Sequence, residues 1–146
     1  MIRTRNPRRD DRTILQLVKQ ELFPYTLLSF PGMRWDAADV RRRLAGNVSY
    51  VAVPRRSGAV GFASLRTAGK ELFLDMLAVD PASRGQGWGK ALLNESERHA
   101  RRKGYRKLML YVNDSNSNAR FFYARHGYTE EGYYPVIRCY KMVKRL

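Results

Sequence analysis

Apolar and polar residues follow one another along this chain with two different periods, which predict strands and helices in alternation. Runs typical of strands are MIRTR, VSYVAV, AVGFASLRT, ELFLDMLAV and KLMLYV, and the tail after Gly127 contains two more, around Gly132 and Pro135. The run ELFLDMLAV is apolar on both faces, which predicts a strand in the centre of a sheet.

Helical spacing predicts four helices among these strands. The first has its apolar residues on one face from Ile14 to Leu22, and the second runs from Asp36 to about Ala45. The third follows a glycine-rich turn and ends near Lys103, and the fourth is a short helix capped by the polar run NDSNSN. The segment FPYTLLSFPGMRW contains two prolines, and we expect it to be a loop.

Composition narrows the class of protein. With 146 residues the chain fits a single domain, residues 1–146, and its 44% hydrophobic residues suffice for a folded core. We expect a cytoplasmic protein, because no apolar run is long enough for a membrane span and no N-terminal stretch resembles a signal peptide. Cys139 is the only cysteine and the two histidines stand apart, so we expect no disulfide and no metal site.

The net charge is strongly positive. Lysine and arginine number 28 against 13 acidic residues, which gives a formal charge of +15 at pH 7. Such an excess suits a polyanionic partner, such as nucleic acid, the ribosome, an acidic peptide or a phosphorylated cofactor, but it also favours solubility. Because the basic residues are scattered over several predicted elements, the charge alone does not identify a nucleic-acid-binding protein.

One stretch, AVDPASRGQGWGKALL, carries a chemical signature. Its strand, glycine-rich turn and helix are typical of a site that binds phosphate on backbone amides. The dinucleotide motif is excluded by the spacing G-x-G-x-G and by the lack of a following acidic residue, and the P-loop motif by Arg84 and Ala91 at positions that need glycine and a hydroxyl. The pattern favours a pyrophosphate bound without metal, with Arg84 and Lys90 adding positive charge.

Two motifs together give a family resemblance. The stretch LAVDPASRGQGWG is similar to the strand, turn and [QR]-x-x-G-x-[GA] pattern of the GNAT superfamily of acyl-CoA-dependent N-acyltransferases. The stretch NSNARFFYARHGY is similar to the second motif of that superfamily, N-x-x-A-x-x-[FL]-Y-x-x-x-G-[FY]. The resemblance implies an α/β fold of the α+β type: a mixed, mostly antiparallel sheet of six or seven strands, flanked by about four helices. A wedge between the fourth and fifth strands would hold acetyl-CoA.

The resemblance also implies roles for the residues of both motifs. The residues that would bind coenzyme A are Leu77, Ala78, Val79, Arg84, Gly85, Gln86, Gly87, Trp88, Gly89, Lys90 and Asn116. The pantetheine arm would pair with the backbone of Leu77 and Val79, and a backbone N–H at the end of that strand would hold the developing oxyanion. Tyr123 would be the general acid that protonates the departing thiolate.

Two of these roles have a structural alternative. Tyr123 shares a helix face with Ala119, Phe122 and His126, so that it could belong to the apolar core. Asn116 could cap the helix that begins after it, with or without touching the cofactor.

The general base is less well defined. Two positions that often carry glutamate in the family are Phe73 and Tyr111 in this sequence. Asp75, a carboxylate on an otherwise apolar strand, is a candidate base, and the alternative is a structural hydrogen bond to a loop. Glu71 and a chain of water molecules are further candidates.

The sequence therefore predicts an N-acetyltransferase that transfers an acetyl group from acetyl-CoA to a primary amine by direct attack. The acceptor stays open among a peptide N-terminus, lysine, a polyamine and a small-molecule amine, although the positive surface argues against a polyamine. We expect it to lie against FPYTLLSFPGMRW and the Tyr133–Tyr134 corner, which the cofactor motifs leave free. A catalytically inactive acyl-CoA-binding sensor and a basic nucleic-acid-binding protein are the alternatives, and the second leaves both motifs unexplained. We expect a monomer or a homodimer, with no membrane partner.

Overall fold

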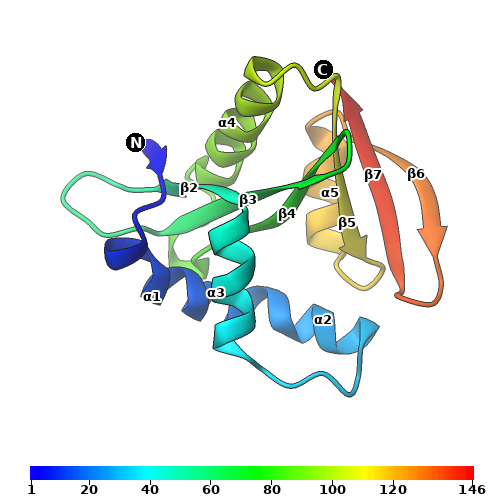
Figure 1. Cartoon of the computed structure of the whole chain (residues 1–146), viewed down its shortest axis with the longest axis horizontal. Helices are drawn as coiled ribbons and strands as arrows, with labels where there is room; N and C mark the ends of the chain where they lie inside the picture. Colours follow the sequence, from blue (N-terminus) through cyan, green and yellow to red (C-terminus); the bar gives the residue numbers. More distant parts are fainter.

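The computed structural model describes all 146 residues as a seven-stranded sheet with helices on both faces (Figure 1). The strands are β1 (Ile2–Thr4), β2 (Val48–Ala52), β3 (Gly61–Ala68), β4 (Glu71–Val79), β5 (Lys107–Asn113), β6 (Thr129–Tyr134) and β7 (Cys139–Arg145). Their spatial order is β1-β2-β3-β4-β5-β7-β6, and all neighbours are antiparallel except β4 and β5. The prediction of a mixed, mostly antiparallel sheet of six or seven strands is confirmed.

Five α-helices surround this sheet. They are α1 (Pro7–Leu17), α2 (Phe23–Ser29), α3 (Ala37–Gly46), α4 (Trp88–Arg102) and α5 (Ser117–Arg125). A π-helical turn (Val18–Leu22) lies between α1 and α2, and a 3₁₀ turn (Pro81–Ser83) follows β4. Since α1, the π turn and α2 follow one another without a break, they form one bent helical segment. Together with α3, α4 and α5 this makes four helical segments, as the sequence predicts. None of the helices has the length and apolar character needed to cross a membrane.

The segment FPYTLLSFPGMRW is half helix, so the prediction of a loop was wrong for its first part. Pro24 lies in the first turn of α2, where a backbone N–H has no helical acceptor, and a proline there does not disturb the helix. Pro31 follows the end of α2 at Ser29, and only residues 30–36 are irregular. Whether such a segment forms a helix depends on where its prolines lie relative to the helix ends, and not on how many prolines it contains.

Two apolar cores lie on the two faces of the sheet. On one face, α4 and α5 contribute Leu92, Leu93 and Tyr123 to a core that includes Leu74 of the central strand β4. On the other face, α1 and α3 pack with Met76 and other residues of β2, β3 and β4. Burial on both faces explains why the run ELFLDMLAV is apolar almost throughout.

The parallel strands β4 and β5 separate after a single paired position. Phe73 of β4 pairs with Met109 of β5, whereas β5 pairs along its whole length with β7. Beyond Phe73, the edge of β4 that faces β5 has no strand partner up to its end at Val79. The glycine-rich turn and α4 continue from this open end.

A bulge in β4 accompanies this separation. Ser64 and Leu65 are consecutive on β3, but their partners on β4 are Met76 and Leu74, so that Asp75 is an extra residue without a partner. A bulge of this kind increases the local twist and bends the strand that carries it. It therefore contributes to turning the end of β4 away from β5.

Candidate active site

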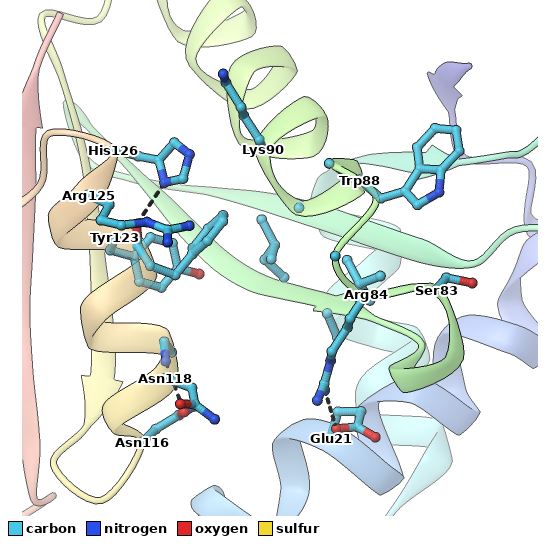
Figure 2. Close-up of a pocket in the computed structure, with 18 of the residues that line it drawn as sticks. Glu21, Ser83, Arg84, Trp88, Lys90, Asn116, Asn118, Tyr123, Arg125 and His126 are labelled. Atoms are coloured by element: carbon cyan, nitrogen blue, oxygen red, sulfur yellow. Dashed lines mark hydrogen bonds and ion pairs between the residues drawn. The ribbon is translucent and has the colours of Figure 1, made fainter.

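A cavity of about 630 Å³ opens where β4 and β5 separate, between the first turn of α4 and one face of α5 (Figure 2). This volume lies in the range of small-molecule binding sites. The end of β4 and the glycine-rich turn form one wall, α5 forms the opposite wall, and the π turn with the start of α2 adds a third side. The lining residues are Glu21, Leu22, Tyr25, Leu77, Ala78, Val79, Ser83, Arg84, Gly85, Gly87, Trp88, Gly89, Lys90, Asn116, Asn118, Ala119, Phe122, Tyr123, Arg125 and His126.

Most of the residues that the sequence predicts for cofactor binding line this cavity. They are Leu77, Ala78, Val79, Arg84, Gly85, Gly87, Trp88, Gly89, Lys90 and Asn116. Gln86 is not among the lining residues, and its side-chain oxygen accepts a hydrogen bond from the indole N–H of Trp88 at 3.3 Å. The structure thus gathers the two motifs around one cavity, although they lie in separate parts of the sequence.

The glycine-rich turn leaves several backbone N–H groups without an acceptor in the protein. Gly87 is the residue before α4, no side chain caps the helix, and the N–H of Ala91 makes the first helical bond, to the carbonyl of Gly87 at 3.0 Å. The N–H groups of the three residues in between, Trp88, Gly89 and Lys90, are therefore free at a helix N-terminus. Such a terminus attracts anions through both its N–H groups and the helix dipole.

Two glycines make the shape of this turn possible. Gly85 and Gly87 have φ angles of 75° and 86°, in the left-handed region that is costly for residues with a side chain. No protein atom lies within 4 Å of the place where a Cβ atom would stand on either residue. The space beside the free N–H groups is therefore open to a ligand.

Arg84 and Glu21 form an ion pair beside this turn. A guanidinium nitrogen of Arg84 lies 2.7 Å from Oε2 of Glu21, which the π turn between α1 and α2 brings to the cavity (Figure 2). Glu21 is the only carboxylate among the lining residues. No pattern in the sequence points to Glu21, because a single acidic residue in an amphipathic helix carries no signal of its own.

Tyr123 is held firmly in the wall formed by α5. Its ring packs edge-on against Phe122 and Tyr128, with centroid distances of 5.3 and 5.7 Å. Tyr128 is fixed in turn by its hydroxyl, which donates to the buried carboxylate of Glu97 at 2.9 Å, and Lys144 donates to the same carboxylate at 2.9 Å. These contacts leave the Tyr123 ring little freedom.

The hydroxyl of Tyr123 makes no hydrogen bond with the protein, although the residue is only 8% exposed and lines the cavity. Burial raises the pKa of Tyr123 well above its usual range, because the phenolate would lose its hydration. The side chain thus belongs to the core and also lines the cavity, so the two explanations of its place in the sequence do not exclude each other.

Asn116 likewise combines two features. Its side-chain oxygen accepts a hydrogen bond from the N–H of Ala119 at 3.2 Å, which caps α5. The same residue lines the cavity, and its side-chain NH₂ group donates to no protein acceptor. The expected cap is present, and donors remain for a ligand.

Asp75 lies outside the cavity. Its carboxylate accepts from the side-chain amide of Asn47 at 3.0 Å and from Arg43 of α3 at 3.0 Å, and Arg66 lies 3.7 Å away. The bulge turns this residue toward α3, where the Arg43 pair and the Asn47 bond satisfy it. These contacts favour the structural alternative over a role as base. Glu71 also lies outside the cavity, 3.9 Å from Lys107.

The side expected to receive the acceptor is rich in aromatic residues. Tyr111 of β5 stacks on Phe73 and meets Tyr134 of β6 edge-on, each at a centroid distance of 5.7 Å. Tyr111 and Tyr134 are both 43% exposed, so that the two contacting rings form an exposed aromatic patch. The end of α2 lies close by, since Asn113 of β5 donates to Ser29 at 3.1 Å. FPYTLLSFPGMRW and the β6–β7 hairpin therefore meet on one side of the molecule.

Comparison with known protein families gives a match over most of the chain. The sequence matches the acetyltransferase (GNAT) family over residues 15–128. The chain belongs to the GNAT acetyltransferase family. This confirms the resemblance inferred from the two motifs, and members of the family use acetyl-CoA.

Individual relatives are similar in sequence to parts of this GNAT chain. It is 39% identical over 80 residues to the ribosomal protein bS18-alanine N-acetyltransferase of Haemophilus influenzae, over 52% of this chain and 54% of that protein. It is 41% identical over 54 residues to the mycothiol acetyltransferase of Geodermatophilus obscurus, over 37% of this chain and 18% of that protein. The matches thus span about half of the first relative and less than a fifth of the second.

A solved structure extends the fold match to the whole GNAT chain. The PaiA N-acetyltransferase of Thermoplasma acidophilum, in complex with coenzyme A, superposes with a TM-score of 0.78 over 100% of this chain and 98% of that one, at 21% identity. At this identity the match supports the fold alone, and it confirms the predicted GNAT fold.

Proposed function

We propose that this protein transfers an acetyl group from acetyl-CoA to a primary amine by direct attack of the amine. The observation that carries the proposal is the row of free backbone N–H groups at the start of α4, which faces the same cavity as the hydroxyl of Tyr123. One wall thus offers an anion-binding site and the opposite wall a proton donor. When bound, acetyl-CoA supplies the activated acetyl thioester.

The glycine-rich turn is the proposed pyrophosphate site. The N–H groups of Trp88, Gly89 and Lys90 are the donors, and Gly85 and Gly87 leave the space beside them open. Five of the six residues from Gly85 to Lys90 line the cavity, and none of the six is acidic. The residues present therefore fit a pyrophosphate group without a metal ion.

The open edge of β4 is the proposed place for the pantetheine arm. Leu77, Ala78 and Val79 line the cavity, and this end of β4 pairs with β3 only. Backbone groups on the free edge of a strand are ready to accept an extended partner. A backbone N–H at the end of this edge would hold negative charge that develops on the acyl oxygen.

Tyr123 is the proposed general acid. Its hydroxyl lines the cavity and has no partner in the protein, so its proton is available to a leaving thiolate. A thiolate that leaves beside this wall would receive a hydrogen bond and then the proton. The fixed ring keeps the donor in one place, which favours proton transfer.

Glu21 is the proposed acceptor of the proton that the amine loses. It is the only carboxylate that lines the cavity, whereas Asp75 and Glu71 lie outside. Its present partner is Arg84, which stands next to the proposed pyrophosphate site. A bound pyrophosphate would compete for Arg84 and so release the carboxylate of Glu21, directly or through water.

The acceptor amine is proposed to approach from the side of α2 and the β6–β7 hairpin. The exposed rings of Tyr111 and Tyr134 favour an acceptor with an apolar or aromatic part. The net charge of +15 disfavours a polyamine. A peptide or protein amine and a small-molecule amine both fit this description.

Two measurements, made one after the other, test the proposed function. Calorimetry with acetyl-CoA in excess EDTA is expected to show binding, and a thiol-release assay over a panel of amines is expected to identify at least one acceptor. Binding without thiol release from any peptide, lysine or small amine would favour the inactive sensor. A protein that binds duplex nucleic acid tightly at physiological salt but not acetyl-CoA would instead be the basic nucleic-acid-binding protein.

A further inference from the structure

One face of the sheet carries exposed side chains that the proposed proton transfer does not use. Side chains of β5 alternate between the two faces, and Leu108, Leu110 and Val112 belong to the core that α4 and α5 cover. Met109 and Tyr111 therefore point to the opposite face, which is also the face that the end of α2 reaches. Tyr111 thus lies on the side from which the acceptor is proposed to approach.

Lys141 of β7 stands beside Tyr111 on this face. The two residues are direct partners in the antiparallel β5–β7 ladder, and such partners share a face, with Cβ atoms about 5 Å apart. On its other side Lys141 pairs with Gly132 of β6. The ring of Tyr134 leans over Gly132, since a Cβ atom on that glycine would lie 3.5 Å from the ring. Lys141 therefore lies on the strand between the two strands that carry the exposed rings.

Lys141 has no partner for its charge. Among the charged residues of β4, β5, β6 and β7, it alone forms no ion pair, and its ammonium group makes no hydrogen bond. The paired residues are Glu71, Asp75, Lys107, Glu130, Glu131, Lys144 and Arg145. Lys141 is also partly buried, so it loses hydration without a compensating partner. A bound carboxylate would supply that partner.

The rings next to Lys141 form a continuous aromatic surface. Phe73 and Tyr111 stack with their planes 9° apart, and Tyr111 in turn contacts Tyr134. The guanidinium of Arg66 lies over the Phe73 ring, 5.0 Å from its centroid, and covers that end of the surface. An apolar or aromatic group that lies on Tyr111 and Tyr134 is therefore within reach of the long, flexible side chain of Lys141.

We propose that Lys141 determines acceptor specificity: the acceptor is an amine with an apolar or aromatic body that carries a carboxylate, and Lys141 pairs with that carboxylate. The inference rests on the proposed function, since it names the acceptor class for the same reaction. Because the ion pair is partly open to solvent, it is expected to raise kcat/KM about fivefold. The carboxylate belongs either to a small-molecule amine or to an acidic residue of a peptide.

The test measures thiol release from acetyl-CoA with two matched pairs of acceptors. One pair is para-aminomethylbenzoate and the corresponding benzamide, and the other is the tripeptide amides Ala-Phe-Glu and Ala-Phe-Gln. Within each pair only the negative charge differs. In at least one pair, kcat/KM is expected to be about fivefold higher for the carboxylate, and to lose this advantage as salt rises. The pair that shows the preference identifies the source of the carboxylate.

Variants of Lys141 separate a specificity role from a structural one. Lys141→Gln is expected to abolish the preference and Lys141→Glu to reverse it, because the sign of the charge beside the aromatic surface is then inverted. KM for acetyl-CoA and Tm are expected to stay close to those of the wild type, whereas a structural role would change them. Lys103→Gln is the matched control: it removes a positive charge at the end of α4, on the opposite face of the sheet, and is expected to keep the preference.

Three outcomes would contradict the proposals, and they are distinguishable. Thiol release at equal rates within both pairs, or from neutral amines only, would overturn the inference and leave the proposed function intact. A preference that survives in Lys141→Gln would overturn the role of Lys141. Absence of thiol release from every amine would overturn the proposed function itself.

Discussion

The two walls of the cavity are built in different ways. The first wall, from Leu77 to Lys90, is one continuous stretch whose contribution comes mainly from backbone N–H groups and from glycines that leave room for a ligand. The second wall consists of α5 together with the π turn and the start of α2, and its contribution comes from side chains such as Tyr123 and Glu21. The proposed cofactor site is thus a local feature of the chain, whereas the proposed proton transfer and acceptor site depend on how distant segments meet.

The largest expected effect comes from a negatively charged side chain in the glycine-rich turn of the first wall. Gly87→Glu is expected to abolish detectable coenzyme A binding in calorimetry, because it adds negative charge to an anion site and forces a residue with a side chain into the left-handed region. We expect Kd to rise by more than about 100-fold.

Gly104→Glu is the matched control for Gly87→Glu. Gly104 has a similar φ of 83° but follows α4 at its far end, outside the cavity. This variant is expected to lose stability but to keep its affinity for coenzyme A. Equal loss of binding in both variants would mean that backbone strain, and not the anion site, is responsible.

Removal of the Tyr123 hydroxyl tests the second wall without changing its packing. Tyr123→Phe is expected to lower kcat by roughly one to three orders of magnitude, since the thiolate then leaves without a proton donor. Coenzyme A affinity and Tm are expected to stay close to those of the wild type. Tyr105→Phe, a similar change outside the cavity, serves as control.

The same residue makes a prediction for alkaline pH. Burial raises the pKa of Tyr123, so the hydroxyl stays protonated through the pH at which an ordinary tyrosine ionises, about 10. The rate is therefore expected not to fall from loss of this proton up to about pH 10. A wild-type rate in Tyr123→Phe would remove Tyr123 from the mechanism.

Glu21 links the two walls, because it belongs to the second wall and pairs with Arg84 of the first wall. Glu21→Gln is expected to lower kcat by about 10- to 100-fold, through loss of the proton acceptor. It is also expected to strengthen coenzyme A binding slightly, because Arg84 is no longer neutralised. Calorimetry and steady-state kinetics on one variant thus give effects of opposite sign.

Asp75→Asn provides the contrast for Glu21→Gln. Asp75 pairs with Arg43 on the far side of the bulge, so this variant is expected to lower Tm and to leave kcat almost unchanged. A large fall in kcat with Asp75→Asn, and none with Glu21→Gln, would return the role of base to Asp75.

The smallest expected effect concerns the acceptor. Tyr134→Ala removes one exposed ring of the aromatic group and is expected to raise KM for the acceptor by about three- to tenfold, with KM for acetyl-CoA unchanged. Phe121→Ala removes an exposed ring of α5 outside the cavity and is the control. A change in KM for acetyl-CoA alone would place the acceptor elsewhere.

The sequence by itself determined the strands of the sheet, the glycine-rich turn before α4 and the family of the protein. The run ELFLDMLAV coincides with β4, and the glycines after it mark the turn that leads into α4, because strand patterns and glycine conformations act over a few neighbouring residues. The second motif likewise marks α5 and Tyr123. These are local signals, and a local pattern is enough to detect them.

The tertiary structure alone decided which side chains share the cavity. Glu21 reaches it because a π turn joins α1 to α2, and Asp75 leaves it because a bulge turns the residue toward Arg43 and Asn47. Neither event has a periodic signal, since each depends on packing between segments that lie far apart in the chain. Proline content predicted a loop where α2 forms. The hydrogen bond from Asn113 to Ser29 brings the end of that helix to β5, the strand that carries Tyr111.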